Sequence, residues 1–262
     1  MISKEAVTVD HPPSDQVGIG WRIVRWAILQ RLGRSARKVL LPRTMIRQDQ
    51  TRWRWLRADV DRFLAATDRE ALALRRIARL GDLPTLGNRL MVELAVFTVA
   101  AYRVMLDQAH DAVDAQAAVA DVGWDVYAAM MRLSSLPGRL SSRNPGRRLR
   151  GTIRLLLRFP FSAPGAPGYA VESWVEGEDI VTHFSHCPPQ SFVRAVIETQ
   201  GDRGEMEAFY RSWCLYDWPG ADIIAGDGRR GHYQRHQTLS RGDARCDMCW
   251  RANPQPIDDQ KA

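Results

Sequence analysis

The chain has 262 residues, of which 26% are charged and 45% are hydrophobic. This composition is that of an ordinary globular protein, and it excludes collagen, long disordered tracts and a coiled-coil rod. A chain of this length can bury a substantial core without disulfides. The formal net charge is +7, and a basic excess of this kind is typical of proteins that bind polyanions or anionic membrane surfaces.

The charge is unevenly distributed along the chain. Residues 1–150 contain 25 Lys and Arg against 15 Asp and Glu, whereas residues 151–262 contain 12 against 15, so the two parts carry +10 and −3. Only three of the 37 basic residues are lysine. We therefore interpret arginine as the default surface cation of this chain, and we expect no nucleic-acid partner because no recognition helix or RNA-binding motif accompanies it.

The first half of the chain is predicted to be helical. Residues 19–32 and 51–66 each combine tryptophans with interleaved arginines, which is typical of basic amphipathic helices. Such helices more often pack on their own domain, and contact with a membrane surface is the alternative. Further helices are predicted at residues 68–80, 90–102 and 110–133. Residues 134–148 are rich in Ser, Pro, Gly and Arg, which predicts a loop or linker followed by a short element at 149–159.

The pattern changes after this linker from long helical periods to short segments. Residues 169–174 and 179–186 are predicted strands, 187–197 and 205–216 are predicted helices, and 231–239 and 245–251 are predicted strands. We therefore expect an α+β fold, in which a helical region at 1–148 packs on an antiparallel sheet with helices at 149–262. No apolar run is long enough to span a bilayer.

All four cysteines, Cys187, Cys214, Cys246 and Cys249, lie in the last 76 residues. The polar N-terminal stretch shows no signal-peptide pattern, so we expect a cytoplasmic protein. Clustered thiols in a reducing compartment are more often reactive or metal-binding than bridged.

Cys187 is expected to lie between a strand and a helix N-terminus, where backbone amides favour a thiolate. His183 is placed by the strand alternation on the same face, as a base near the thiol. The alternative for Cys187 is a small buried thiol. Cys214 and Asp217 are three residues apart on a predicted helix and should share a face.

The Cys246 and Cys249 pair resembles a metal knuckle, but on a strand the two side chains point to opposite faces. We therefore expect no bound metal and no cofactor, with zinc held by Cys187, Cys214 and Cys246 as the alternative. Dinucleotide-binding, phosphate-loop, serine-hydrolase and zinc-protease motifs are absent from the sequence.

Several separated pieces together suggest a family. They are His-Cys-Pro at 186–188, Cys214 with Asp217, Arg235, Thr238-Leu239, and Gly242-Asp243 followed by Cys246-Asp247. In this order and spacing they resemble the L-2-amino-thiazoline-4-carboxylic acid hydrolase family over about residues 165–253. Met248 stands where the family has an aromatic residue, Pro189 adds a second proline, and Cys249 is extra.

The resemblance implies a cofactor-independent hydrolase that opens a small cyclic amidine-like ring by thiolate attack. We expect the catalytic residues to be Cys187, Cys214, Asp217, Cys246, Asp247 and His183, and the substrate-binding residues to be Asp243, Arg235, Thr238 and His186. The alternative is a sensor that binds a small molecule or a metal through the clustered cysteines. A homo-oligomer is compatible with either function.

Overall fold

The computed structural model describes residues 19–47, 49–109 and 111–254. The polar N-terminal stretch, at residues 1–15, lies outside this part of the chain. The first half contains helices α1 (Ile19–Leu40), α2 (Arg57–Ala78), α3 (Leu86–Leu106), α4 (Ala112–Ser141) and α5 (Pro145–Arg158), with a small hairpin of β1 (Thr44–Ile46) and β2 (Arg52–Arg54). The second half contains β3 (Ala170–Glu176), β4 (Asp179–His186), α6 (Pro188–Gln200), α7 (Glu205–Ser212), α8 (Asp217–Ala225), β5 (Tyr233–Gln234) and β6 (Cys246–Trp250).

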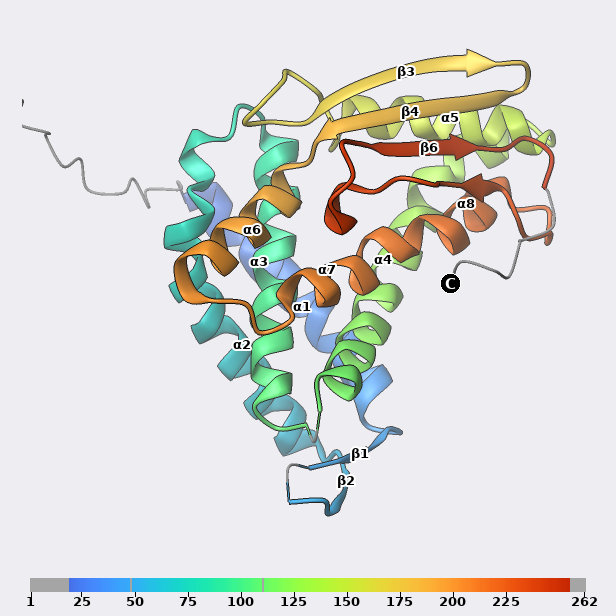
Figure 1. The fold of residues 1–262 in the computed structure, drawn as a ribbon. Helices are drawn as coiled ribbons and strands as arrows, with labels where there is room; N and C mark the ends of the chain where they lie inside the picture. The colour runs from blue at the N-terminus through green and yellow to red at the C-terminus, as the bar shows by residue number, and fades with distance from the viewer. Residues whose placement is uncertain (1–18, 48, 110, 255–262) are drawn as a thin grey trace, which may run out of the picture.

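The larger sheet is antiparallel, with strand order β3-β4-β6-β5. It lies at one end of the helices, and the β1–β2 hairpin lies at the other (Figure 1). Helices α5 and α8 pack against the sheet. The predicted α+β fold, with a helical first half packed on an antiparallel sheet and helices, is therefore confirmed.

Helix α3 occupies the centre of the helical layer. Fourteen of its residues are buried, on nearly every side of the helix, as expected for a core helix. Around it, one apolar cluster joins α1, α2 and α3 to Phe192 on α6 and Phe209 on α7. A second cluster joins Met131 on α4 and Leu149 on α5 to Ile180 and Trp250 of the sheet. Each cluster thus contains residues from both sides of residue 148.

The predicted loop at residues 134–148 is wrong for most of its length. Helix α4 continues to Ser141 with Pro137 inside it, and α5 begins at Pro145 after Asn144, whose side chain accepts a hydrogen bond from the Arg147 amide at 2.9 Å. A proline inside a helix removes one hydrogen bond. Packing of α4 on α5, close enough to place Gly138 against the Arg148 backbone, outweighs that loss.

The predicted helix at 51–66 is also wrong at its start. Residues 52–54 form strand β2, and α2 begins only at Arg57, where the Asp59 side chain accepts a hydrogen bond from the Leu56 amide at 2.8 Å. The helix then continues without a break to Ala78, so the two predicted helices are one, and it ends two residues before the predicted end at residue 80. Trp53, Trp55 and Phe63 are buried in the core, so the aromatic residues of this segment serve packing.

One glycine in α3 allows a close approach between the two halves. A Cβ atom at Gly87 would overlap the carbonyl oxygen of Pro160, so we expect Gly87→Ala to lower the free energy of unfolding by about 1–3 kcal/mol. Gly151 on α5 is the matched control, since a Cβ there meets no described atom within 4 Å. Gly151→Ala should raise stability by roughly 0.5–1 kcal/mol. Urea denaturation of both variants measures the difference, and equal effects would contradict it.

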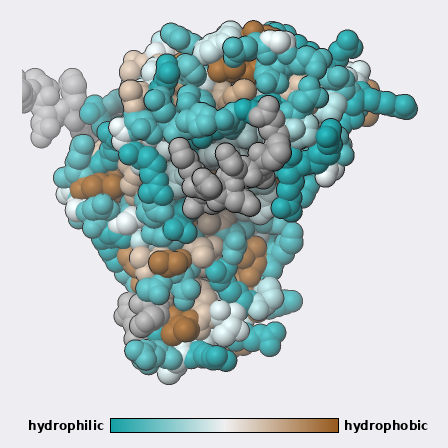
Figure 2. All heavy atoms as spheres, turned by 45° about the vertical axis from the view of Figure 1, so that its right-hand side comes forward, coloured by the Kyte–Doolittle hydropathy of each residue, from teal (hydrophilic) through white to brown (hydrophobic). Residues whose placement is uncertain are grey.

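The surface shown in Figure 2 is mainly hydrophilic, with small separate hydrophobic patches. Across the described residues, none of the helices has both the length and the apolar character required to cross a membrane.

Candidate functional site

Three of the four cysteines converge where α6, the segment after α7, and β6 meet. The Cys214 Sγ lies 3.1 Å from the Ser240 hydroxyl, which lies 3.4 Å from the Thr238 hydroxyl, which in turn lies 3.4 Å from the Cys246 Sγ. Cys187 packs in the same apolar cluster as Cys246. We call Cys187, Cys214, Cys246 and Asp217 the thiol–carboxylate cluster.

A break in the chain positions Cys214 and Asp217. The predicted helix at 205–216 is interrupted, because α7 ends at Ser212 and Trp213 leaves helical geometry with φ −134° and ψ −61°. Cys214 opens a short 3-10 turn, and Asp217 begins α8. The Trp213 side chain fixes this break, since its indole N–H donates to the Thr98 hydroxyl at 3.0 Å and its ring stacks on Phe209. The two residues therefore belong to different elements.

The Asp217 carboxylate accepts three hydrogen bonds from side chains around the cluster. Its Oδ2 accepts hydrogen bonds from Tyr233 at 3.2 Å and from the Arg235 guanidinium at 3.1 Å, and its Oδ1 accepts one from Tyr127 at 3.4 Å. Burial raises the pKa of Asp217 to about 6, and the charge of Arg235 opposes this rise. A carboxylate with this pKa is ionised at neutral pH and is basic enough to accept a proton.

Arg235 links the Asp217 carboxylate to the backbone of Cys214. Besides its bond to Asp217, it donates to the Cys214 carbonyl oxygen at 3.0 Å, and its guanidinium lies 4.7 Å from the Trp218 ring centroid. Its side chain is only 2% exposed. The guanidinium therefore donates its hydrogen bonds to groups of the protein.

Burial raises the pKa of every thiol in the cluster. The pKa of Cys214 rises to about 11, while the nearby positive charge of Arg235 and the hydrogen bond with Ser240 oppose the effect of burial. Burial raises the pKa of Cys187 well above its usual range and also raises that of Cys246. Any thiolate chemistry at neutral pH therefore needs a proton acceptor beside the thiol.

The four members of the cluster differ in access to solvent. Cys187 and Cys214 are half-buried, and the Asp217 side chain is 17% exposed. Cys246 is buried, and its Sγ accepts a hydrogen bond from the Leu239 amide at 3.3 Å. Cys246 is therefore the least exposed member of the cluster.

The predicted role of His183 as a base beside Cys187 conflicts with the geometry. His183 is opposite Asp247 in the sheet register, and its ring lies 4.7 Å from that of Trp174. Phe184 and Cys246, which pack with Cys187, occupy the other face of the sheet. The alternation fails at Cys187 because β4 ends at His186.

Two further predicted residues shape the loop before β6. The Asp247 carboxylate accepts hydrogen bonds from the amides of His236 and Gln237 at 2.8 and 2.6 Å. The Asp243 carboxylate accepts one from the Thr238 amide at 2.6 Å. These bonds replace sheet pairing, which explains why the predicted strand at 231–239 is reduced to Tyr233–Gln234.

His186 lies beside the cluster and is held by its own neighbours. Its Nδ1 lies 2.6 Å from the Gly168 carbonyl oxygen, and its Nε2 lies 3.1 Å from the Ser191 hydroxyl. Cys187 itself is the N-cap residue of α6, as predicted.

Cys246 and Cys249 point to opposite faces of β6, as the sequence predicted. Cys246 packs with Phe184, whereas the Cys249 Sγ lies 4.0 Å from the Asp179 carboxylate on the other face. Within residues 19–47, 49–109 and 111–254, no group of three or more His, Cys, Asp or Glu side chains is arranged to hold a metal ion. The alternative zinc ligands Cys187, Cys214 and Cys246 thus lie near one another without forming such a group.

Sequence reasoning missed three residues that contact the cluster. Tyr233 and Ser240 lie between recognisable motif pieces but have no distinguishing pattern of their own. Tyr127 comes from α4, 90 residues before the carboxylate it contacts, and no local signal could connect the two.

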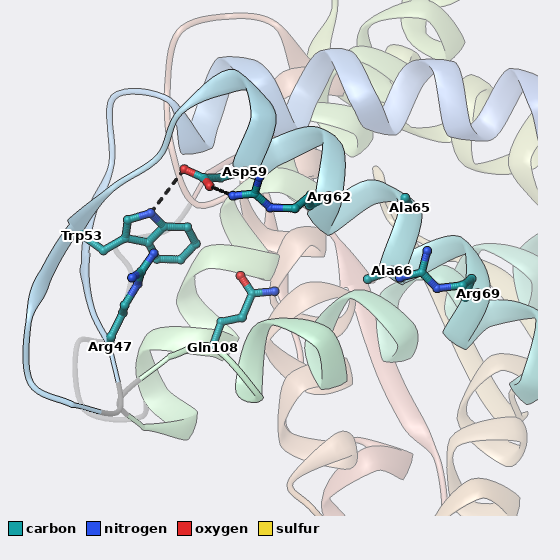
Figure 3. Close-up of a pocket in the computed structure, with 8 residues that line it drawn as sticks. All are labelled: Arg47, Trp53, Asp59, Arg62, Ala65, Ala66, Arg69 and Gln108. Carbon is teal, nitrogen blue, oxygen red and sulfur yellow. Dashed lines mark hydrogen bonds and ion pairs between the residues drawn. The ribbon is translucent and has the colours of Figure 1, made fainter.

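A separate pocket of about 390 Å³ lies at the opposite end of the molecule, beside the β1–β2 hairpin (Figure 3). Arg62 pairs with Asp59 there, and Arg47 lies over the Trp53 ring at 4.7 Å. The pocket shares no lining residue with the thiol–carboxylate cluster.

Comparisons of this chain with protein-family models, with curated proteins and with solved structures give no match.

Proposed function

We propose that the protein is a hydrolase that opens a small cyclic amidine-like ring, of the 2-aminothiazoline type, with Cys214 as nucleophile and Asp217 as proton acceptor. The observation that carries the proposal is that Arg235 holds both a carboxylate of pKa about 6, at Asp217, and the backbone carbonyl of the half-buried Cys214. The motif resemblance supports the same residues. A nucleophile beside a base that is itself oriented by a third group is the general arrangement of covalent catalysis.

Cys214 is favoured over Cys187 because of its surroundings. Burial raises the pKa of Cys214 to about 11, but the positive charge of Arg235 and the hydrogen bond with Ser240 oppose this rise and so favour the thiolate. Cys187 packs among Met91, Tyr169 and Phe184 in an apolar cluster, where burial disfavours the charged form.

The proposed reaction consumes one water. Asp217 takes the thiol proton, the Cys214 sulfur bonds to the ring carbon between nitrogen and sulfur, and the bond from that carbon to the ring sulfur breaks. The ring sulfur takes the proton from Asp217. Water then adds its oxygen to the same carbon, one of its protons goes to the amidine nitrogen, and the other goes to the Cys214 sulfur as that sulfur leaves. The product is a carbamoyl group on the opened chain, and the enzyme thiol is regenerated.

Arg235 acts in this proposal as a positioning residue. Its donors are directed at Asp217 and at the Cys214 carbonyl, so we assign it to holding the nucleophile and the base rather than to the substrate contact expected from the sequence.

The test is ring opening of L-2-amino-thiazoline-4-carboxylate, followed by titration of the released thiol and by the mass gain of one water. Because removing a covalent nucleophile costs several orders of magnitude in rate, we expect Cys214→Ser to lower kcat/KM by about 10³-fold or more. Cys249→Ser is the matched control, since Cys249 lies on the opposite face of β6, and it should stay within about twofold.

Two outcomes would contradict the proposal. Full activity in single serine variants of all four cysteines would exclude a thiol mechanism. Failure of the wild-type protein to open any member of a panel of cyclic amidines and lactams would exclude the hydrolase function.

A further inference from the structure

The second half of α4, the turn after it and α5 form a surface that lacks acidic residues. Between residues 126 and 171 the sequence contains eight arginines and no Asp or Glu. Six of the arginines are exposed: Arg132, Arg139, Arg143, Arg147, Arg154 and Arg158. The ion pairs among the described residues use other cations. None of these six arginines therefore forms an ion pair with the described part of the chain.

Large apolar side chains are exposed on the same elements as these arginines. Leu133, Leu136 and Leu140 are 68%, 47% and 87% exposed, and their spacing of three and seven residues places them in one stripe along α4. On α5 and at its end, Leu155 and Phe159 are 45% and 49% exposed. We call the six arginines and these five apolar residues the basic–apolar face.

Helix α1 packs on the first half of α4, on the side of that helix that leads into the leucine stripe. Asp125, eight residues before Leu133, accepts hydrogen bonds from Ser35 and Arg31 of α1. Beyond that contact α1 and α4 diverge toward the sheet end of the molecule (Figure 1). The remaining part of the α4 stripe is left open to solvent.

We propose that the basic–apolar face docks the protein on an anionic lipid bilayer. Arginines attract anionic headgroups, while exposed leucines and phenylalanine enter the boundary between headgroups and acyl chains. A second copy of the chain fits this face poorly, because a symmetric contact would bring together two arginine-rich surfaces without a carboxylate. A nucleic acid would use the arginines but would leave the leucines and the phenylalanine exposed.

The test is co-sedimentation of the full chain with vesicles of phosphatidylcholine containing 30 mol% phosphatidylglycerol, compared with pure phosphatidylcholine. We expect at least tenfold stronger partitioning onto the anionic vesicles and loss of that difference at high salt, because charge attraction is screened. Substituting Leu133, Leu136 and Leu140 together by Gln should lower partitioning at least fivefold, and so should substituting Arg147, Arg154 and Arg158 by Gln.

Matched controls remove the same groups elsewhere. The leucine control uses three exposed leucines elsewhere: Leu56, which caps α2, Leu72 on α2 and Leu86 on α3. The arginine control uses three exposed arginines of β2 and α2, Arg52, Arg54 and Arg57. Both triple Gln variants at these sites should partition like the wild type. Equal loss in the controls, or equal binding to pure phosphatidylcholine, overturns the proposal.

Three other results also overturn it. They are wild-type binding by the leucine variant, a dimer in light scattering that the leucine variant disrupts, and tighter binding to duplex DNA than to the vesicles. The proposal is independent of the hydrolase function, so Cys214→Ser should bind vesicles like the wild type.

Discussion

Asp217→Asn is expected to lower ring-opening activity by about 10²–10⁴-fold, the usual contribution of a positioned general base. The reason is that an amide keeps the shape of the carboxylate but cannot accept the Cys214 proton. With the wild type, kcat/KM should rise with pH and level off above the pKa of Asp217, which burial raises to about 6. Rate measurements between pH 5 and 8 should show this rise in the wild type and no inflection near pH 6 in the variant.

Two controls make this prediction specific. Asp222→Asn changes a carboxylate on the same helix, one that accepts a hydrogen bond from the His232 amide, and it should leave the inflection in place. Tyr233→Phe removes a hydrogen bond that lowers the pKa of Asp217, so it should move the inflection to higher pH. A pH profile that Asp217→Asn leaves unchanged would show that another group accepts the proton.

The same pKa has a consequence for stability with a definite sign. An unfolded Asp titrates near 3.8, whereas the folded Asp217 titrates at about 6. Between these values the native state binds more protons than the unfolded state, so the contribution of this group to stability falls as the pH rises through that window. The protein therefore holds an ionised carboxylate at neutral pH at a cost to its folding free energy, as is common at catalytic sites.

Glu93→Gln is expected to lower the free energy of unfolding by about 3–5 kcal/mol, the usual cost of breaking a buried ion pair from one side. Glu93 is fully buried, and it accepts hydrogen bonds from Arg75 at 2.9 Å, from Arg25 at 3.0 Å and from the Trp21 indole at 3.3 Å. Neutralising it leaves Arg75, which is 5% exposed, without this counter-charge. Chemical denaturation monitored by tryptophan fluorescence measures the change.

An exposed ion pair provides the comparison. Arg37 and Asp61 pair at 2.8 Å with side chains that are 47% and 58% exposed, so Asp61→Asn should change stability by no more than about 0.5 kcal/mol. Replacing Glu93 and Arg75 together by Leu and Met should recover part of the loss, since apolar substitutes for a buried pair avoid its desolvation. A small effect of Glu93→Gln alone would show that solvent reaches the pair.

The sequence predicted those elements whose periodicity is regular and local. Strand β4 matches its predicted bounds because its alternation is uninterrupted, and α6 begins after Cys187 because proline suits the first turn of a helix. The breaker signal at Pro137 failed because tertiary packing against α5 outweighs one lost hydrogen bond. The helix break at Trp213 has no breaker residue, and it depends on a partner in α3, so local propensity could not reveal it.

Some residues of the candidate site could likewise be predicted from the sequence, and others could not. Cys187, Cys214, Cys246 and Asp217 were selected from motif spacing, and the fold brings them together. His183 was paired with Cys187 by extending the strand alternation one residue beyond β4, to Cys187, where side-chain direction no longer follows a period of two. Tyr127 comes from α4 and could be found only from three-dimensional structure.

The contacts that hold the helix break at Trp213 determine which fragments of the chain could keep the arrangement of the cluster. Trp213 is held by Thr98, Tyr216 donates to the Ala120 carbonyl oxygen, and Asp217 accepts from Tyr127. All three anchors precede residue 148, whereas every cysteine follows it. A fragment that starts at residue 149 would carry the whole motif set and lose the three supports that orient it. The presence of the motif residues and their arrangement in space are therefore separable properties of this chain. Transferring the cysteine-bearing segment to another protein would require α3 and α4 as well.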